Sequence, residues 1–401
     1  MKKFRTKQSN IQRSEPIGIY VHIPFCAERC AYCDFLTFPH MQKLHEPYVR
    51  ALLKEIETDA ARRGLHGRSA DSIFFGGGTP SLLDAGYIEA ILNSLRRVVS
   101  VSPDAEISLE ANPGTLTRPD IQRLRAAGVN RISLGVQTFD DSLLALCRRS
   151  HRAADVSEQV ALLRREGIQN VNLDMIYAIP GQTLRLLKRD FQAVERLSPE
   201  HISWYSLIVE ERTLFYRWLR EGKIKPVSED SEEEAFECIR AFLHGAGYER
   251  YEVSNFARPG HASRHNLKYW TGKPYWGVGL GAASYLDGER SACVDRFRVF
   301  FERVEQGRAT WEPEARTAEE DCFERVMMGL RCTAGMDRAD FRRRTGRDIL
   351  SLAPALFQRY RERGHLCWSD RAVWMSDAGL RLQNQFLSDL LYEMERKERR
   401  E

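Results

Sequence analysis

The sequence lacks the features that would place the protein across a membrane or send it out of the cell. Its 401 residues contain no run of about 18 apolar residues, so no helix is expected to span a bilayer. The first ten residues are basic, but no apolar stretch follows them, which argues against a secretory signal. We therefore expect residues 1–15 to form a flexible N-terminal arm and the protein to be cytoplasmic.

A strong net charge is also missing. Lys and Arg together number 60 and Asp and Glu 56, which leaves a net charge of +4 at pH 7. This balance is too mild to indicate a nucleic-acid partner. It is compatible with an anionic small-molecule ligand but does not require one.

Cysteine is present in an odd and uneven pattern. Three of the nine cysteines crowd between positions 26 and 33, and the others are scattered. An odd count with one dense group indicates a metal site in a reducing compartment rather than a disulfide framework. We expect the scattered cysteines to be packed free thiols; they are Cys147, Cys238, Cys293, Cys322, Cys332 and Cys367.

The first part of the chain alternates strand-like and helix-like segments. The expected strands are residues 18–23, 71–75, 106–110, 131–135, 170–175 and 201–207, and the expected helices are residues 47–63, 84–99, 118–127, 141–148, 155–166 and 184–197. Helical crossovers predict an α/β fold with a parallel sheet, which either stays open or curls towards a barrel. Functional residues should then gather at the carboxyl ends of the strands.

The later part of the chain has a different pattern. Ser231 to Glu234 resembles a capping box that opens a helix ending near His244. Residues 247–290 are rich in Gly, Tyr and Trp with little helical periodicity, and the chain after Pro313 is helical and charged. With a boundary near Thr310, we expect a core at 16–245, an extension packed on it at 246–310 and a helical C-terminal domain at 311–395.

The dense cysteine group directly follows the first predicted strand. Cys26, Cys30 and Cys33 are separated by three and then two residues. Structural zinc is usually held by four ligands, and no second pair lies nearby. An iron–sulfur cubane usually takes four thiolates, so three would leave one iron open to a small ligand. A zinc knob or three packed thiols are the alternatives.

A run of glycines follows the second long predicted strand. Gly76, Gly77 and Gly78 precede Thr79 and Pro80, and glycine allows the backbone to approach a ligand closely. Alone, such a run indicates only a turn. Together with the cysteine group, it predicts a binding site at the carboxyl ends of the strands.

On these motifs the sequence resembles the radical S-adenosylmethionine (SAM) enzymes. Within them it is similar to the anaerobic coproporphyrinogen III oxidase-like family, closest to its haem-chaperone branch, and the similarity runs from Ile17 to about Gln385. The resemblance implies a partial (β/α)6 TIM-like barrel with a smaller, mainly helical C-terminal domain. It also implies that Cys26, Cys30 and Cys33 hold a [4Fe-4S] cluster whose open iron binds SAM.

The resemblance assigns SAM-binding roles to residues near the predicted strand ends. Tyr20 would pack on SAM, Tyr32 would contact the adenine, and Arg149 would pair with the SAM carboxylate. The remaining implied contacts are Gly77, Gly78, Thr79, Glu110, Gln137 and Asp174. Taken singly, these side chains could equally be helix caps, turn amides or surface ion pairs.

Two features favour the haem-chaperone branch over the decarboxylating enzymes. Cys33 is followed by Asp34 and Phe35, where the decarboxylating enzymes usually have a fourth cysteine, and the arm before Cys26 is short. The run His265-Asn-Leu-Lys-Tyr-Trp270 resembles a motif associated with haem binding, which implies His265 as an axial ligand. His261 could compete for that role, and a hydrogen-bonded structural histidine is the alternative.

The resemblance therefore predicts a haem chaperone of porphyrin metabolism. Such a protein would bind haem and a SAM-ligated [4Fe-4S] cluster and deliver the haem to acceptor haemoproteins. The alternatives are an oxygen-independent coproporphyrinogen III dehydrogenase and a radical SAM enzyme that modifies haem. The sequence leaves open whether SAM is cleaved, which proteins accept the haem, whether the haem is held covalently, and whether the protein dimerises or associates peripherally with a membrane.

Overall fold

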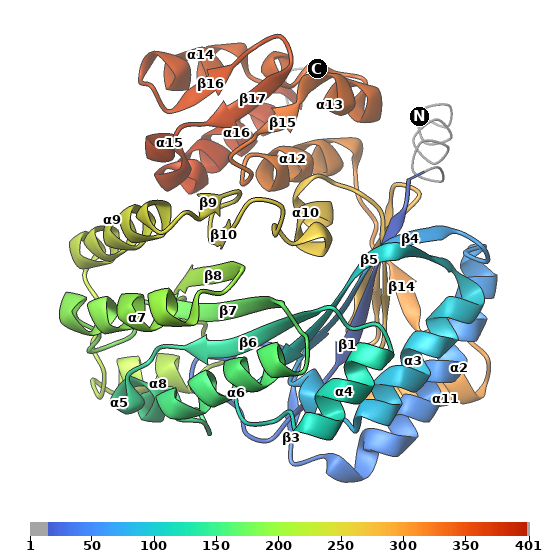
Figure 1. The fold of residues 1–401 in the computed structure, drawn as a ribbon. Helices are drawn as coiled ribbons and strands as arrows, with labels where there is room; N and C mark the ends of the chain where they lie inside the picture. Colours follow the sequence, from blue (N-terminus) through green and yellow to red (C-terminus); the bar gives the residue numbers. More distant parts are fainter. Residues whose placement is uncertain (1–14, 399–401) are drawn as a thin grey trace.

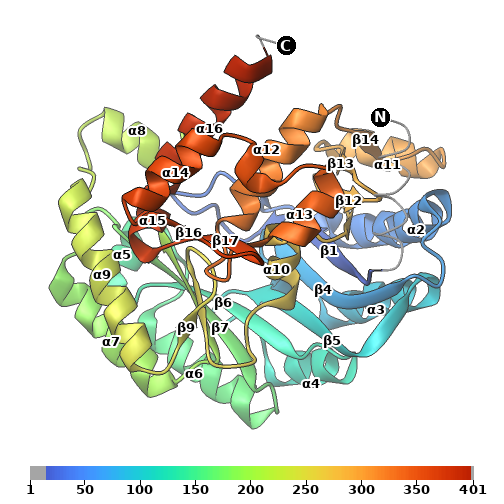
Figure 2. The ribbon, with the colours of Figure 1, turned by 90° about the horizontal axis from the view of Figure 1, so that it is seen from above.

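The computed structural model describes residues 15–398, so the expected arm at 1–15 lies outside the described residues except for Glu15. A curved sheet with helices on its outer side forms the larger part of the molecule (Figure 1). A smaller group of helices and short strands, formed by the C-terminal part of the chain, sits against one end of it (Figure 2). No helix among residues 15–398 is long and apolar enough to cross a bilayer.

The centre of the sheet consists of parallel strands joined by helices. The strands run in the order β1 (Ile17–Ile23), β4 (Ser69–Gly77), β5 (Ser100–Ala111), β6 (Arg131–Gln137), β7 (Asn170–Tyr177) and β8 (His201–Ser206). The connecting helices are α2 (His45–Arg63), α3 (Ala85–Val98), α4 (Arg118–Ala126), α5 (Asp141–Leu146), α6 (Ala153–Arg165) and α7 (Leu184–Leu197). The predicted α/β alternation is confirmed.

The barrel is partial because its two outermost strands pair with other partners. β1 pairs with β11 (Tyr275–Val278) on its free side, and β8 pairs with β10 (Asn255–Ala257). The sheet continues from β11 through β12 (Ala283–Leu286), β13 (Glu289–Cys293) and β14 (Trp311–Pro313), and beyond β10 lies β9 (Glu249–Arg250). The predicted partial (β/α)6 barrel is thereby confirmed as the fold class.

Local sequence signals explain these elements. Six of the seven residues of β1 are buried, as expected for a strand covered on both faces. Gly64 ends α2 in the left-handed conformation with φ of 63°, which glycine adopts without steric cost. The Thr183 hydroxyl accepts a hydrogen bond from the amide of Leu186 and so caps the start of α7.

Two helices begin where the sequence did not predict them. α9 (Glu229–Gly245) starts ahead of the expected capping box, because the Ser228 hydroxyl, not that of Ser231, accepts the capping hydrogen bond. α10 (Arg264–Trp270) lies in the stretch where no helix was expected, with Ser263 as its cap. Seven residues are too few to show a helical period in the sequence. The other helices of this part are α8 (Leu214–Arg220) and α11 (Phe297–Glu305).

The C-terminal part has its own apolar core. It contains α12 (Ala318–Gly329), α13 (Arg338–Thr345), α14 (Pro354–Glu362), α15 (Asp377–Arg381) and α16 (Gln383–Glu398), with a small sheet in the order β15 (Met336–Asp337), β17 (Ala372–Met375) and β16 (Leu366–Trp368). Val326, Phe357 and Phe386 are buried in its centre. The Arg344 guanidinium binds the Glu15 carboxylate just before β1, so this part meets the barrel at the amino ends of the strands.

Candidate functional site

The three clustered cysteines lie in a loop that the rest of the fold holds in place. Cys26 ends the short strand β2 (Phe25–Cys26), which pairs with β3 (Phe38–Pro39). Ala31 is fully buried, and its amide donates to the Cys147 carbonyl over 3.0 Å. Its carbonyl accepts from the Phe215 amide over 2.8 Å. These anchors keep the loop against α5 and α8 and leave the three cysteines only partly covered.

All three cysteines line one cavity of about 500 Å³ at the carboxyl ends of the strands. Of the side chains that the sequence predicted to bind SAM, most line the same cavity: Tyr32, Gly77, Gly78, Thr79, Glu110, Gln137, Arg149 and Asp174. Residues from β4, β5, β6 and β7 thus meet at one edge of the sheet, as expected for parallel strands. A volume of this size falls within the range typical of small-molecule sites.

The glycine run is required by close approach of the cysteine loop. A Cβ atom on Gly78 would lie 2.5 Å from the carbonyl oxygen of Phe25, and one on Gly77 would lie 2.5 Å from the His22 ring. The Gly78 amide donates to the Ile23 carbonyl over 2.8 Å, and the Thr79 amide donates to Phe25 over 2.7 Å. The glycines therefore join the end of β4 to the start of the loop that carries Cys26.

Two half-buried carboxyl groups line the cavity. Glu110 accepts a hydrogen bond from the Gly77 amide over 3.1 Å, and Asp174 accepts one from the Ser133 hydroxyl over 2.7 Å. Burial, together with the neighbouring Asp174, raises the pKa of Glu110 to about 8. Burial also raises the pKa of Asp174. A cationic ligand placed here would favour the ionised forms of these acids.

Arg149 links the cysteine loop to the strand ends. Its guanidinium donates to the Cys30 sulfur over 3.2 Å, and its second terminal nitrogen donates to the Asn112 side chain and the Gly135 carbonyl over 2.6 Å each. Within residues 15–398 its buried Nε has no hydrogen-bond partner. The free donor leaves capacity for an anionic ligand.

Gln137 and Tyr20 occupy different positions relative to this cavity. Gln137 lines the cavity and has a positive φ of 70°, a conformation that a non-glycine residue adopts at some cost and that is common at functional sites. Tyr20 is not among the lining residues; its hydroxyl hydrogen-bonds to His22 Nδ1 over 3.0 Å, and its ring stacks on Phe74. The Tyr20 ring also lies beside Gly76, as does the Glu110 carboxylate, and its contact with SAM stays a prediction.

The three cysteines line the cavity without converging on a single point. Among the described residues, no three His, Cys, Asp or Glu side chains converge as they would around one ion. A cubane places each thiolate on a different iron, so its ligands do not need to meet at one point. Burial raises the pKa of Cys33 to about 11 and also raises that of Cys26, so a metal bound by these thiols would have to displace their protons.

His265 lies outside this cavity, at the opposite end of the barrel. The imidazole is 1% exposed, with Nδ1 at 3.1 Å from the Ser72 hydroxyl and Nε2 at 2.8 Å from the Tyr269 hydroxyl. Burial lowers the pKa of His265 to about 3, so the ring is neutral. Both ring nitrogens are thus engaged, and an iron could bind only after one of these contacts opened. The competing residue His261 is placed beside Arg131, which donates to its carbonyl.

The sequence did not single out Asn112, although it ties several site residues together. Its side-chain amide donates to the Thr79 hydroxyl over 3.2 Å while its carbonyl oxygen accepts from Arg149. Asn112 follows Glu110 by two residues at the end of β5. Alternate residues of a strand share a face. The spacing of two residues from Glu110 could therefore have indicated that Asn112 faces the same cavity.

Comparison with known proteins agrees with this geometry. The model of the radical SAM superfamily matches residues 20–194, and that of the HemN C-terminal domain matches residues 317–382. The heme chaperone HemW of Bacillus subtilis (strain 168) is 35% identical over 94% of this chain and 99% of its own length. The heme chaperone HemW of Escherichia coli (strain K12) is 35% identical over 82% of this chain and 86% of its own length.

A solved structure shares the fold over almost the whole chain. Coproporphyrinogen III oxidase (HemN) from Escherichia coli, described as a radical SAM enzyme, superimposes with a TM-score of 0.82. The match covers 97% of this chain and 93% of that one, at 24% sequence identity. At this identity the similarity establishes the architecture of the barrel and the C-terminal part.

Proposed function

The chain belongs to the HemW family within the radical SAM superfamily, and from this premise we propose that it is a haem chaperone. It binds haem and passes it to acceptor haemoproteins. The observation that carries the proposal is the similarity to heme chaperones along nearly the full length of both chains. The residues after the third cysteine, Asp34 and Phe35, add support because no fourth cysteine stands there.

Membership of the radical SAM superfamily brings a [4Fe-4S] cluster and SAM as cofactors. In our proposal Cys26, Cys30 and Cys33 hold the cluster, which when bound supplies an electron to SAM. Arg149 holds Cys30 and offers its free nitrogen to the SAM carboxylate. Glu110 and Asp174 face the cationic and hydroxyl groups of SAM from the opposite wall.

The other predicted contacts have supporting roles in this proposal. Tyr32 lies beside the cavity near Phe215, where it can pack against the adenine. Gly77, Gly78 and Thr79 keep the strand end close to the cluster loop, and Gln137 presents an amide at the end of β6. Tyr20 stacks on Phe74 and lies beside Gly76, from where it would support the bound SAM. His265 remains a proposed contributor to haem binding through its motif.

Haem titration and haem transfer test this proposal directly. Anaerobically reconstituted protein should give a saturable Soret shift with one haem per chain and should then pass that haem to an apo-haemoprotein such as apomyoglobin. Absence of specific haem binding would overturn the proposal.

The same preparation with SAM, a reductant and coproporphyrinogen III tests the alternative function, because appearance of protoporphyrinogen IX would identify a dehydrogenase. Consumption of haem during SAM turnover would instead identify a haem-modifying enzyme.

A further inference from the structure

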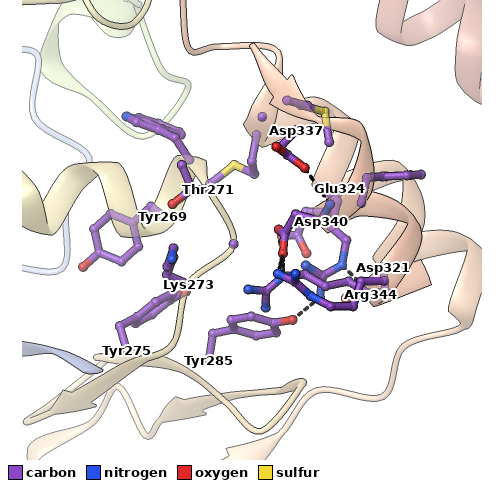
Figure 3. A pocket seen from close by; sticks show the side chains of 18 of the residues that line it. Tyr269, Thr271, Lys273, Tyr275, Tyr285, Asp321, Glu324, Asp337, Asp340 and Arg344 are labelled. Carbon is purple, nitrogen blue, oxygen red and sulfur yellow. Dashed lines mark hydrogen bonds and ion pairs between the residues drawn. The ribbon is translucent and has the colours of Figure 1, made fainter. Parts of the chain in front are cut away.

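A second cavity, of about 400 Å³, lies between the barrel and the C-terminal part (Figure 3). It shares no lining residue with the cysteine cavity. One side is formed by the end of α10, the loop after it and the strands β11 to β13. The other side is formed by α12, β15 and α13. It therefore lies at the amino ends of the barrel strands, on the far side of α10 from the cysteine loop.

The barrel side of this interdomain cavity is an aromatic wall. The rings of Tyr269 and Tyr275 meet edge to face at 4.6 Å between centroids, and Tyr275 and Tyr285 follow at 6.3 Å. The C-terminal side contributes the apolar side chains of Met328, Met336 and Phe341. Aromatic faces opposite thioethers and a phenyl ring favour a flat apolar ligand.

Several residues that line the cavity carry a buried hydrogen-bond donor to which the described part of the chain offers no partner. Arg290 and Arg344 form ion pairs with Glu324 and Asp340 at 2.6 and 2.9 Å. In the part of the chain that the structure describes, Arg290 Nε, one terminal nitrogen of Arg344 and the Trp270 indole nitrogen are nevertheless buried without a partner. Arg344 is only 3% exposed. Because buried donors are rarely left unpaired, these atoms indicate a missing ligand that carries acceptors such as carboxylates.

We infer that this interdomain cavity is the tetrapyrrole site of the protein, which rests on the proposed function for the choice of ligand. The macrocycle packs against the aromatic wall formed by Tyr269, Tyr275 and Tyr285, and its carboxylates meet Arg290 and Arg344. Thr271 and Lys273 are exposed at the edge of the cavity, so one side of the ligand stays open to solvent. An open side suits a ligand that must be handed to another protein.

His265 then acts as a positioning residue and not as an iron ligand. Its Nε2 holds the Tyr269 hydroxyl, while its Nδ1 contacts Ser72 on β4. The aromatic wall is thereby fixed to the end of the barrel. Replacement of His265 would move Tyr269 and weaken ligand binding without any change in the atoms bound to iron.

Haem titration of a blocked variant tests the location. Thr271→Trp fills the edge of the cavity from an exposed position and should weaken haem binding by about tenfold or more. The matched control Asn93→Trp places the same side chain on the exposed face of α3, away from both cavities, and should bind like the wild type. Equal haem affinity of the two variants would overturn the inference while leaving the proposed function intact. Failure of the wild type to bind haem would overturn both.

Hydrogen exchange on the unmodified protein locates the ligand without any substitution. Haem should protect amides within residues 268–275 and 325–344 and leave those of the cysteine loop, residues 26–37, unchanged. Protection confined to the cysteine loop would contradict the inference. This measurement remains decisive even if Thr271→Trp fails to fold.

Two spectroscopic comparisons test the positioning role of His265. The variant His265→Gln should bind haem more weakly, yet the absorption and EPR spectra of its bound haem should match those of the wild type. A changed spectrum would show that the imidazole ligates the iron.

Metal-free protoporphyrin IX should also bind, and its binding should be weakened by Thr271→Trp, because the inferred contacts involve the ring faces and carboxylates. Binding that strictly required iron would contradict this.

Discussion

The cysteine cavity and the interdomain cavity lie at opposite ends of the same barrel and are built in different ways. The first gathers residues from neighbouring strand ends, such as Glu110 and Asp174, and these two half-buried acids are close enough to interact. The second is formed between two apolar cores, and its charges are mostly matched in ion pairs such as Arg290 with Glu324. The first is therefore electrostatically prepared for a cation and a metal cluster, and the second for a flat ligand with acceptor groups.

Removal of a cluster cysteine is expected to have the largest effect and to be confined to the first cavity. Cys30→Ala should abolish the [4Fe-4S] absorption and reduce bound iron to background after anaerobic reconstitution, because two thiolates cannot hold the cubane. Cys367→Ala, in the C-terminal sheet, removes a thiol remote from the loop and should leave the iron content unchanged. Full iron loading of Cys30→Ala would refute the assignment. Haem binding by this variant should persist if the two cavities act separately.

The half-buried acid Glu110 in the first cavity should make the stability of the protein depend on pH. Because the pKa of Glu110 is raised from 4.5 to about 8, the folded protein keeps a proton there that the unfolded chain releases. Each rise in pH between these two pKa values therefore lowers the free energy of unfolding. The loss of stability is complete once the pH exceeds the pKa of Glu110 in the folded protein. Relative to the wild type, Glu110→Gln should gain about 4 kcal/mol between about pH 5 and about pH 9.

Urea unfolding of the cluster-free protein at several pH values measures this difference. Glu158→Gln, on the exposed face of α6, is the matched control and should show no such trend. A stability difference between Glu110→Gln and the wild type that stays constant with pH would mean that the acid is ionised in the folded protein. In that case the contrast between the two cavities would disappear.

Two arginine substitutions, one in each cavity, should each weaken the binding of a different ligand. The expected loss of binding free energy is smaller than the effect at Glu110. Arg149→Lys loses the forked contact to Cys30, Asn112 and Gly135 and should weaken SAM binding by about 2 kcal/mol, while haem affinity stays unchanged. Arg344→Lys should have the opposite pattern, with weaker haem binding and unchanged SAM binding. Calorimetric titration of SAM and of haem into each variant gives the four binding affinities. Equal losses for both ligands in either variant would mean that the cavities are coupled.

The sequence predicted the first cavity well because its residues follow a rule of topology. Carboxyl ends of parallel strands meet at one edge, so Glu110 and Asp174 could be placed together without coordinates. The spacing of Cys26, Cys30 and Cys33 is a local pattern, so it can be recognised from the sequence alone. Tyr20 is not among the residues that line the cavity, and neither the motif nor the strand period specifies whether its side chain contacts the ligand.

The second cavity could not be predicted because no local pattern encodes it. Its walls come from residues around Tyr269 and around Arg344, which become neighbours only when the C-terminal part docks on the barrel. The motif that contains His265 ends in residues that line this cavity, but the position of the imidazole depends on Ser72 from a distant strand. Because this cavity depends on long-range packing, its Tyr, Met and Arg residues form no recognisable pattern in the sequence.

The smallest expected effect concerns the contact that joins the aromatic wall to the barrel. Tyr269→Phe keeps the ring but removes the hydroxyl 2.8 Å from His265 Nε2, which leaves a buried nitrogen unpaired and should cost about 1 kcal/mol of stability. Haem affinity should fall only severalfold, because the ring face remains. Tyr275→Phe, in the same wall and 4.6 Å from the Tyr269 ring, is the matched control for loss of a hydroxyl. If Tyr275→Phe weakened haem binding as much as Tyr269→Phe, the His265 contact would not be what positions the wall.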